Sequence, residues 1–283
     1  MSGAANSDFL LGMAAASRQR DKHARGLLSD AQQRSQLLCL NAPLSLRLQD
    51  KGFDLIAEIK KHSPAEGELD AGLASLELQA NAYIKGGAAA LSVLTEPDQF
   101  RGSLNDLHAV SQQSGSVPVM RKDFLTSRYQ VREARLAGAS GVLLIAAILE
   151  VEQMQAMLEA AFELGLFVLM EAFDQADIDK CVPVLEQFGP AVDDASRCHY
   201  LLGVNCRDLR TLQVDFAHFA RMATSLPASM PWVAESGVNE VAHAEILARL
   251  GYRLALVGTA LMRSDNPAGT VDEFRQAGVA ACS

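Results

Sequence analysis

Eight short apolar runs recur along the chain from residue 55 onward, and stretches of helical length separate most of them. The runs are Leu55–Glu58, Ala90–Leu94, Val117–Met120, Gly141–Ala147, Phe167–Met170, Leu201–Val204, Trp232–Ala234 and Leu254–Val257. Short continuous apolar runs are typical of buried strands, and strands that alternate with helices indicate a parallel sheet. The pattern therefore predicts an α/β fold.

The intervening stretches have amphipathic, helical spacing. They are Leu76–Lys85, Leu104–Ser111, Tyr129–Ala137, Glu152–Leu164, Asp174–Leu185 and Glu240–Leu250. Several end at a glycine that leads into the next strand, as at Gly138, Gly165 and Gly251, which is typical of helix C-termini. Eight such units in about 250 residues favour a closed (β/α)8 TIM barrel. The alternative, an open doubly wound sheet, predicts a glycine-rich loop after the first strand, and residues 61–66 contain no GxGxxG.

The first 54 residues have a different pattern. Phe9, Leu10 and Met13 recur at helical spacing, but the segment has too few large apolar residues for a core of its own. We interpret residues 1–54 as an N-terminal helical extension packed on the barrel, and residues 55–283 as the barrel domain. A long connection at 182–200 is expected on the amino-terminal face of the barrel, away from any chemistry.

Composition narrows the range of functions. The net charge of −9 gives no excess of positive charge for binding nucleic acid. No stretch of the sequence is apolar enough to span a membrane. The N-terminus lacks the pattern of a signal peptide, and the five cysteines show no CxxC spacing. We therefore expect a cytoplasmic protein with reduced thiols, no membrane association and no metal site.

Polar or small residues follow most of the predicted strands at their carboxyl ends. They are Glu58 and Lys60; Thr95 and Glu96; Arg121, Lys122 and Asp123; Glu171; Asn205 and Arg207; Glu235, Ser236 and Gly237; and Gly258 and Thr259. In a barrel these ends meet at one face, where active sites lie. Exposure of the strand ends to solvent would explain the charged residues Glu96 and Asp123 equally well. They explain Glu171 poorly, because residues 166–172 are otherwise apolar.

Two lysines and two glutamates of this group form a candidate acid–base set. Glu58 and Lys60 are two residues apart and so point to the same side of their strand, although a surface ion pair would look the same. Burial raises the pKa of a carboxyl group unless a cation lies nearby, and Lys60 and Lys122 are the cations available to Glu171. The small residues after the last two strands favour a phosphate site, which recurs at that place in this fold.

Eight ordered segments resemble the indole-3-glycerol-phosphate synthase family. They are Ile56–Pro64 (IAEIKKHSP), Leu91–Glu96 with Phe100–Leu104, Pro118–Phe124 (PVMRKDF), Gly141–Ile145, Leu169–Glu171, Gly203–Leu209 (GVNCRDL), Val233–Gly237 (VAESG) and Val257–Met262 (VGTALM). The resemblance runs from about residue 55 to 263. It implies ring closure of 1-(2-carboxyphenylamino)-1-deoxyribulose 5-phosphate with loss of carbon dioxide and water, without a metal or organic cofactor.

The resemblance also implies residue roles. Lys122 would be the general acid, and Glu171 would be its acid–base partner. Lys60 would contact the substrate carboxylate and share in acid catalysis. Glu58 and Asn205 would orient these groups. The implied substrate-binding residues are Ser63, Phe100, Phe124, Leu143, Arg207, Leu209, Glu235 and Ser236, with Gly237, Gly258 and Thr259 at the phosphate.

Two other functions stay open on the sequence. One is a different phosphate-binding barrel enzyme, similar to phosphoribosyl-anthranilate isomerase, and the other is a non-catalytic subunit of a tryptophan-pathway assembly. The Glu58 and Lys60 pair, together with Lys122 and Glu171, argues against the first. A non-catalytic subunit would tolerate the loss of Lys122 or Glu171, and both are present. We expect a small phosphorylated substrate as the partner, and a monomer or weak oligomer.

Overall fold

The structure is a computed structural model that describes residues 4–48, 52–64, 67–68, 76–207 and 213–282. Parallel strands close into a barrel in the order β1-β10-β9-β8-β7-β6-β5-β4. These strands are β1 (Asp54–Ile59), β4 (Ala90–Leu94), β5 (Val119–Lys122), β6 (Gly141–Ile145), β7 (Phe167–Ala172), β8 (Tyr200–Asn205), β9 (Trp232–Glu235) and β10 (Leu254–Val257). Every predicted apolar run overlaps one of them, with shifts of up to two residues at the ends, so the predicted TIM barrel is confirmed. A small hairpin of β2 (His62–Ser63) and β3 (Gly67–Glu68) follows β1.

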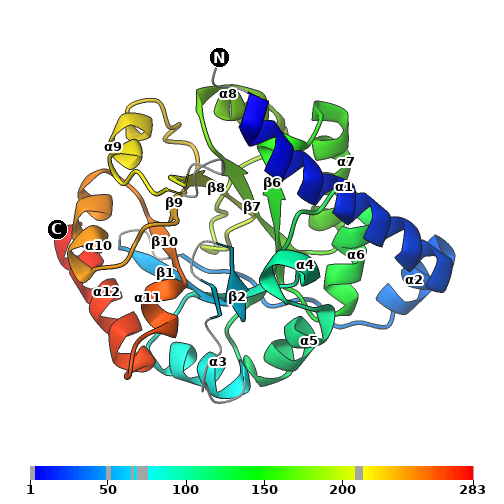
Figure 1. Cartoon of the computed structure of the whole chain (residues 1–283), viewed down its shortest axis with the longest axis horizontal. Coiled ribbons are helices and arrows are strands. Elements are labelled where there is room, and N and C mark those ends of the chain that lie inside the picture. The colour runs from blue at the N-terminus through cyan, green and yellow to red at the C-terminus, as the bar shows by residue number, and fades with distance from the viewer. Residues whose placement is uncertain (1–3, 49–51, 65–66, 69–75, 208–212, 283) are drawn as a thin grey trace.

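Helices surround the barrel, as Figure 1 shows. They are α3 (Leu76–Lys85), α5 (Leu104–Gln113), α6 (Arg128–Leu136), α7 (Val151–Glu163), α8 (Gln175–Leu185), α9 (Ala217–Ala223), α10 (Val241–Arg249) and α12 (Pro267–Ala281). Shorter turns are α4 (Pro97–Phe100), η1 (Ala146–Ile148), η2 (Glu186–Phe188) and α11 (Thr259–Met262). The six predicted helices are confirmed with small shifts at their ends. Among the described residues, no helix is both long enough and apolar enough to cross a membrane.

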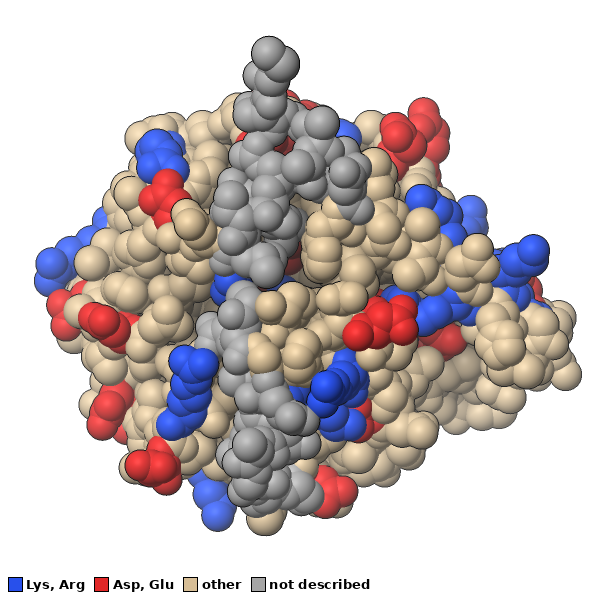
Figure 2. Space-filling view, viewed as in Figure 1, with Lys and Arg blue, Asp and Glu red and all other residues tan. Residues whose placement is uncertain are grey.

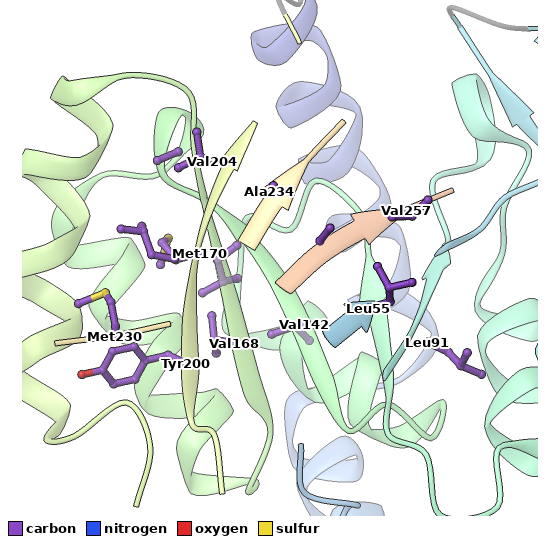
Figure 3. Packing of buried hydrophobic residues seen from close by; sticks show 14 of the residues in the cluster. Leu55, Leu91, Val142, Val168, Met170, Tyr200, Val204, Met230, Ala234 and Val257 are labelled. Atoms are coloured by element: carbon purple, nitrogen blue, oxygen red, sulfur yellow. The ribbon is translucent and has the colours of Figure 1, made fainter. Parts of the chain in front are cut away.

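Alternation along each strand separates two cores. Leu55 packs outward with the helices, together with Val168 and Val257, and Figure 3 shows this outer layer between strands and helices. Ile56 belongs to a second cluster with Leu169 and the other inward-facing residues, which fills the barrel. Because the side-chain period of a strand is two, Glu58 and Glu171 continue the inward faces of Ile56 and Leu169 at the carboxyl ends.

The N-terminal helices lie against one side of the barrel. Helix α1 (Ala4–Leu27) crosses the rim above α6 and η1, and α2 (Asp30–Leu37) packs on α6 (Figure 1). Leu10 and Met13 are buried there, and Arg20 Nη2 forms an ion pair with Asp123 Oδ1 at 2.7 Å. These contacts agree with an extension packed on the barrel, although the division after residue 54 stays a prediction.

Residues 42–48, between α2 and β1, lie at the bottom of the barrel. Leu46 and Leu48 are buried in the inner core, and the backbone of these residues forms no helix. Cys198 N donates to Leu46 O at 2.8 Å and Leu48 N donates to Ser196 O at 3.1 Å. The long connection between α8 and β8 therefore pairs with the N-terminal segment at the end opposite the strand carboxyl ends.

Candidate active site

The inward positions at the carboxyl ends of the strands bring the predicted charged residues together. Lys122 ends β5, Glu171 lies near the end of β7, and Glu235 ends β9. Asn205 is paired in register with Glu235 across β8 and β9. Parallel pairing aligns these ends, so side chains from separate parts of the sequence meet in one mouth.

Lys122 lies between two carboxylates. Its Nζ is 2.7 Å from Glu235 Oε2 and 3.4 Å from Glu171 Oε2, and its side chain is only 15% exposed. Burial acts to lower the pKa of Lys122, but the charges of Glu235, Glu171 and Glu58 outweigh it, so the net pKa is raised. Lys122 is therefore a cation in the resting site, with a proton to donate.

Glu235 is the deepest of these groups. Burial first, and then the charge of Glu171, raises its pKa despite the opposing charge of Lys122. Its Oε1 has no hydrogen-bond partner in the described part of the chain. A Cβ at Gly203 would lie 2.1 Å from that oxygen, so only glycine at this position of β8 leaves room for the carboxylate. Glu235 thus forms an ion pair with Lys122 from the buried side of the site.

Glu58 and Lys60 form a second charged pair across the mouth. Lys60 Nζ lies 2.8 Å from Glu58 Oε1. Burial acts to raise the pKa of Glu58, but the charges of Lys60 and Lys122 lower it overall, which keeps the carboxylate ionised. A Cβ at Gly258 would lie 2.5 Å from Glu58 Oε1 and 3.1 Å from Lys60 Nζ. Gly258 therefore makes space for this pair.

Asn205 links Glu171 to the chain that follows β8. Its Nδ2 donates to Glu171 Oε1 at 3.2 Å, and its Oδ1 accepts from Arg207 N at 3.0 Å. The two bonds fix which way the amide points and hold one oxygen of Glu171. The other oxygen faces Lys122, so Glu171 is oriented from both sides.

An apolar wall forms the opposite side of the cavity. Phe124 lies between two other rings, with ring centroids 6.4 Å from Phe100 and 6.2 Å from Phe9. Leu143 of β6 and Leu10 of α1 complete this side. The sequence reasoning missed Phe9 and Leu10 as site residues, although their helical spacing already indicated an apolar face.

Small residues line the remaining end of the cavity. Ser63, Ser236, Gly237, Gly258 and Thr259 all face it. Ser236 and Gly237 have φ of 68° and 70°, so two successive residues are in the left-handed region. Such a turn brings backbone groups close to a ligand and suits an anion.

The structure thus gathers nearly all of the predicted site residues around one space of about 1020 Å³, its open mouth included. The predicted residues that line it are Glu58, Lys60, Ser63, Phe100, Lys122, Phe124, Leu143, Glu171, Asn205, Arg207, Ser236, Gly237, Gly258 and Thr259. Glu235 contacts Lys122 beneath this lining, and Leu209 lies outside the described residues. Residues not predicted for the site include Pro64, Leu94, Ile145, Val238 and Asn239.

Comparison with known proteins agrees with this geometry. The family model described as indole-3-glycerol phosphate synthase matches residues 14–274. The protein named indole-3-glycerol phosphate synthase in Mycolicibacterium gilvum is 41% identical over 239 residues, which cover 84% of this chain and 82% of that one. Its counterpart in Mycobacterium tuberculosis is 41% identical over 231 residues, 82% of this chain and 79% of that one.

Solved structures of other enzymes share the fold alone. The 3-hexulose-6-phosphate synthase of Salmonella typhimurium aligns with a TM-score of 0.61 at 16% identity, covering 81% of this chain and 100% of that one. That likeness is structural, whereas the family match includes the charged mouth, the small-residue end and the part of the aromatic wall formed by Phe100, Phe124 and Leu143. On this evidence the chain belongs to the indole-3-glycerol phosphate synthase family.

Proposed function

We propose that the chain closes the indole ring of its substrate, converting 1-(2-carboxyphenylamino)-1-deoxyribulose 5-phosphate to indole-3-glycerol phosphate in tryptophan biosynthesis. The observation that supports this most is the Lys122 ammonium, held by two buried carboxylates at a cavity with an aromatic wall. Such a cavity suits an aromatic ring that carries an anion at each end.

Binding would use the three sides of the cavity. The carboxyphenyl ring would lie against Phe100 and Phe124, with its carboxylate toward Lys60 and Arg207. The phosphate would lie at the small-residue end, at Gly237 and the residues grouped with it. Two anions held apart in this way fix the carbonyl carbon of the substrate near Lys122.

The chemistry would begin as the ring carbon that bears the carboxylate attacks the substrate carbonyl carbon. The electron pair of the carbonyl moves to its oxygen, which takes a proton from Lys122. Carbon dioxide then leaves, and the pair of the broken bond restores the aromatic ring. The new hydroxyl takes a proton from Lys60, the second acid that the family resemblance implies, and departs as water, while Glu171 accepts the proton lost in forming the indole double bond.

The wider setting of the protein is also proposed. On the face shown in Figure 2, Lys and Arg side chains are interspersed with Asp and Glu, and the net charge of the chain is −9. This supports the absence of a nucleic-acid partner, while the family of the chain supports a small phosphorylated substrate. We further propose a cytoplasmic monomer or weak oligomer that does not associate with membranes.

The test is to mix the purified chain with the substrate in EDTA and follow indole fluorescence. Wild type should produce indole, and Lys122→Ala should lose turnover while still binding the substrate. Lys85→Ala, at an exposed position of α3, is the matched control and should behave as wild type. A folded wild type that binds the substrate without forming indole would contradict the proposal and favour a non-catalytic subunit.

A further inference from the structure

The loop after β9 holds an unfavourable backbone conformation. Ser236 has φ of 68°, in the left-handed region that side chains other than glycine seldom adopt, and Gly237 follows at 70°. Such a conformation persists only where the surroundings hold it in place. Ser236, Gly237, Val238 and Asn239 all line the small-residue end of the cavity. The contacts that hold this loop therefore determine the shape of that end.

Three contacts hold the loop. Cys206 Sγ donates to Ser236 O at 3.4 Å. Val214 packs closely on Gly237, since a Cβ at the glycine would lie 2.3 Å from Val214 Cγ1. At the far end of the loop, Asn239 N donates to His243 Nδ1 at 3.2 Å.

His243 joins two loops. It is the third residue of α10, whose N-cap residue, Glu240, forms no side-chain capping bond. Its ring stacks on Phe216 with centroids 4.2 Å apart and planes at 28°, and Phe216 in turn meets Phe219 edge to face at 5.3 Å. The imidazole thereby links the loop after β9 to the segment that leads into α9. A ring fixed on one side by stacking presents its Nδ1 to the backbone in a defined direction.

We propose that His243 is a positioning residue that holds the phosphate-binding turn in shape, through the hydrogen bond it accepts from the Asn239 backbone. The role rests on the proposed function, in which the turn at Ser236 and Gly237 binds the substrate phosphate. Only a ring with a free lone pair on Nδ1 accepts this bond, so a side chain without an acceptor cannot replace it. Loss of the bond would loosen the turn and weaken binding without touching Lys122.

Charged groups near His243 come from the segment on which its ring stacks and from its own helix. The segment on which it stacks carries Asp215, His218 and Arg221, and Asp215 already pairs with Arg221. Its own helix, with the N-cap residue Glu240, carries Glu245, which pairs with Arg249 at 3.6 Å. Asp215 and Glu245 thus each pair with an arginine, and Nδ1 of His243 accepts the bond from Asn239 N.

The test compares His243→Gln, which keeps an acceptor, with His243→Leu, which has none. KM, kcat and the calorimetric affinity for indole-3-glycerol phosphate are measured for each, with His108→Gln in α5 as the control. The Gln variant should match wild type, while Leu binds about three- to tenfold more weakly, with KM raised and kcat little changed.

A Leu variant that binds as tightly as wild type, or a Gln variant that binds as weakly as the Leu variant, would overturn the inference. Thermal unfolding of each variant separates local loosening from loss of the fold. If wild type forms no indole, the proposed function fails, and calorimetry with the product alone decides the role of His243.

Discussion

Replacing Glu235 by glutamine removes the charge beneath Lys122 while keeping the shape of the side chain. The carboxylate lies 2.7 Å from Lys122 Nζ and is about 1% exposed. At an effective dielectric constant of about 20, the gross attraction over that distance is about 6 kcal/mol. Burying the charge costs several kcal/mol, and the raised pKa of Glu235 means that this cost exceeds the attraction to Lys122. We therefore expect Glu235→Gln to raise the free energy of unfolding by about 1 kcal/mol at pH 8, where wild type carries the charge.

The pH dependence of that change has a definite sign. The pKa of Glu235 is raised above its ordinary 4.5 in the folded protein, chiefly by burial. A raised pKa means that the folded state holds the proton more tightly than the unfolded state. Its stabilising contribution is complete below pH 4.5 and is lost as the pH rises through the raised value. Wild type should therefore lose stability relative to Glu235→Gln between pH 5 and pH 8.

Activity should respond differently from stability. Lys122 loses the negative charge of its nearest partner, and Glu171, at 3.4 Å, is the carboxylate that it still contacts. A displacement of about 1 Å at a reacting group can cost about 100-fold in rate, so kcat should fall by about that factor. KM should change little, because Glu235 lies outside the lining of the cavity.

Urea unfolding at pH 5 and pH 8 and initial-rate kinetics measure these quantities, with Glu273→Gln, exposed on α12, as the control. A raised KM with unchanged kcat would refute the reasoning and indicate that Glu235 contacts the substrate instead. A difference in stability between wild type and Glu235→Gln that is the same at both pH values would refute the account of its burial.

Three further substitutions test other parts of the site. Glu171→Gln should lower kcat by roughly 100- to 10,000-fold with little change in KM, because it removes an acid–base group and keeps the shape; initial rates near those of wild type would count against this role. Phe100→Ala should raise KM about tenfold, since one face of the aromatic slot is lost, and an unchanged KM would place the ring elsewhere. Gly237→Ala should lower the free energy of unfolding by about 1–3 kcal/mol, because its φ of 70° is left-handed and Val214 packs against it. Urea unfolding checks this, and equal stability would show that the turn relaxes easily.

The barrel could be predicted from the sequence because its strands are short, apolar and regularly interrupted. The same alternation that buries Ile56 and Leu169 places Glu58 and Glu171 on the inward face, so the charged mouth follows from local spacing and the fold together. Ordered segments such as the one around Lys122 resemble those of a known family, and this resemblance predicts the roles of individual residues in the site.

Contacts between distant parts of the chain could not be predicted in this way. The spacing of Phe9 and Leu10 shows that α1 has an apolar face, but not that this face meets Phe124 and the cavity. The space that Gly203 leaves for the buried oxygen of Glu235 depends on how β8 and β9 pair. Packing and register between elements determine such features, and a single sequence does not state them.

The most direct test of the account uses substrate labelled in its carboxylate carbon, with enzyme in excess, and measures carbon dioxide and indole-3-glycerol phosphate in the same samples. Wild type should release one labelled carbon dioxide for each indole formed. Lys122→Ala should release neither while it still binds the substrate. Indole formation by Lys122→Ala at a rate near that of wild type, or carbon dioxide release without ring closure in wild type, would contradict the assignment of Lys122 as the acid that starts the reaction.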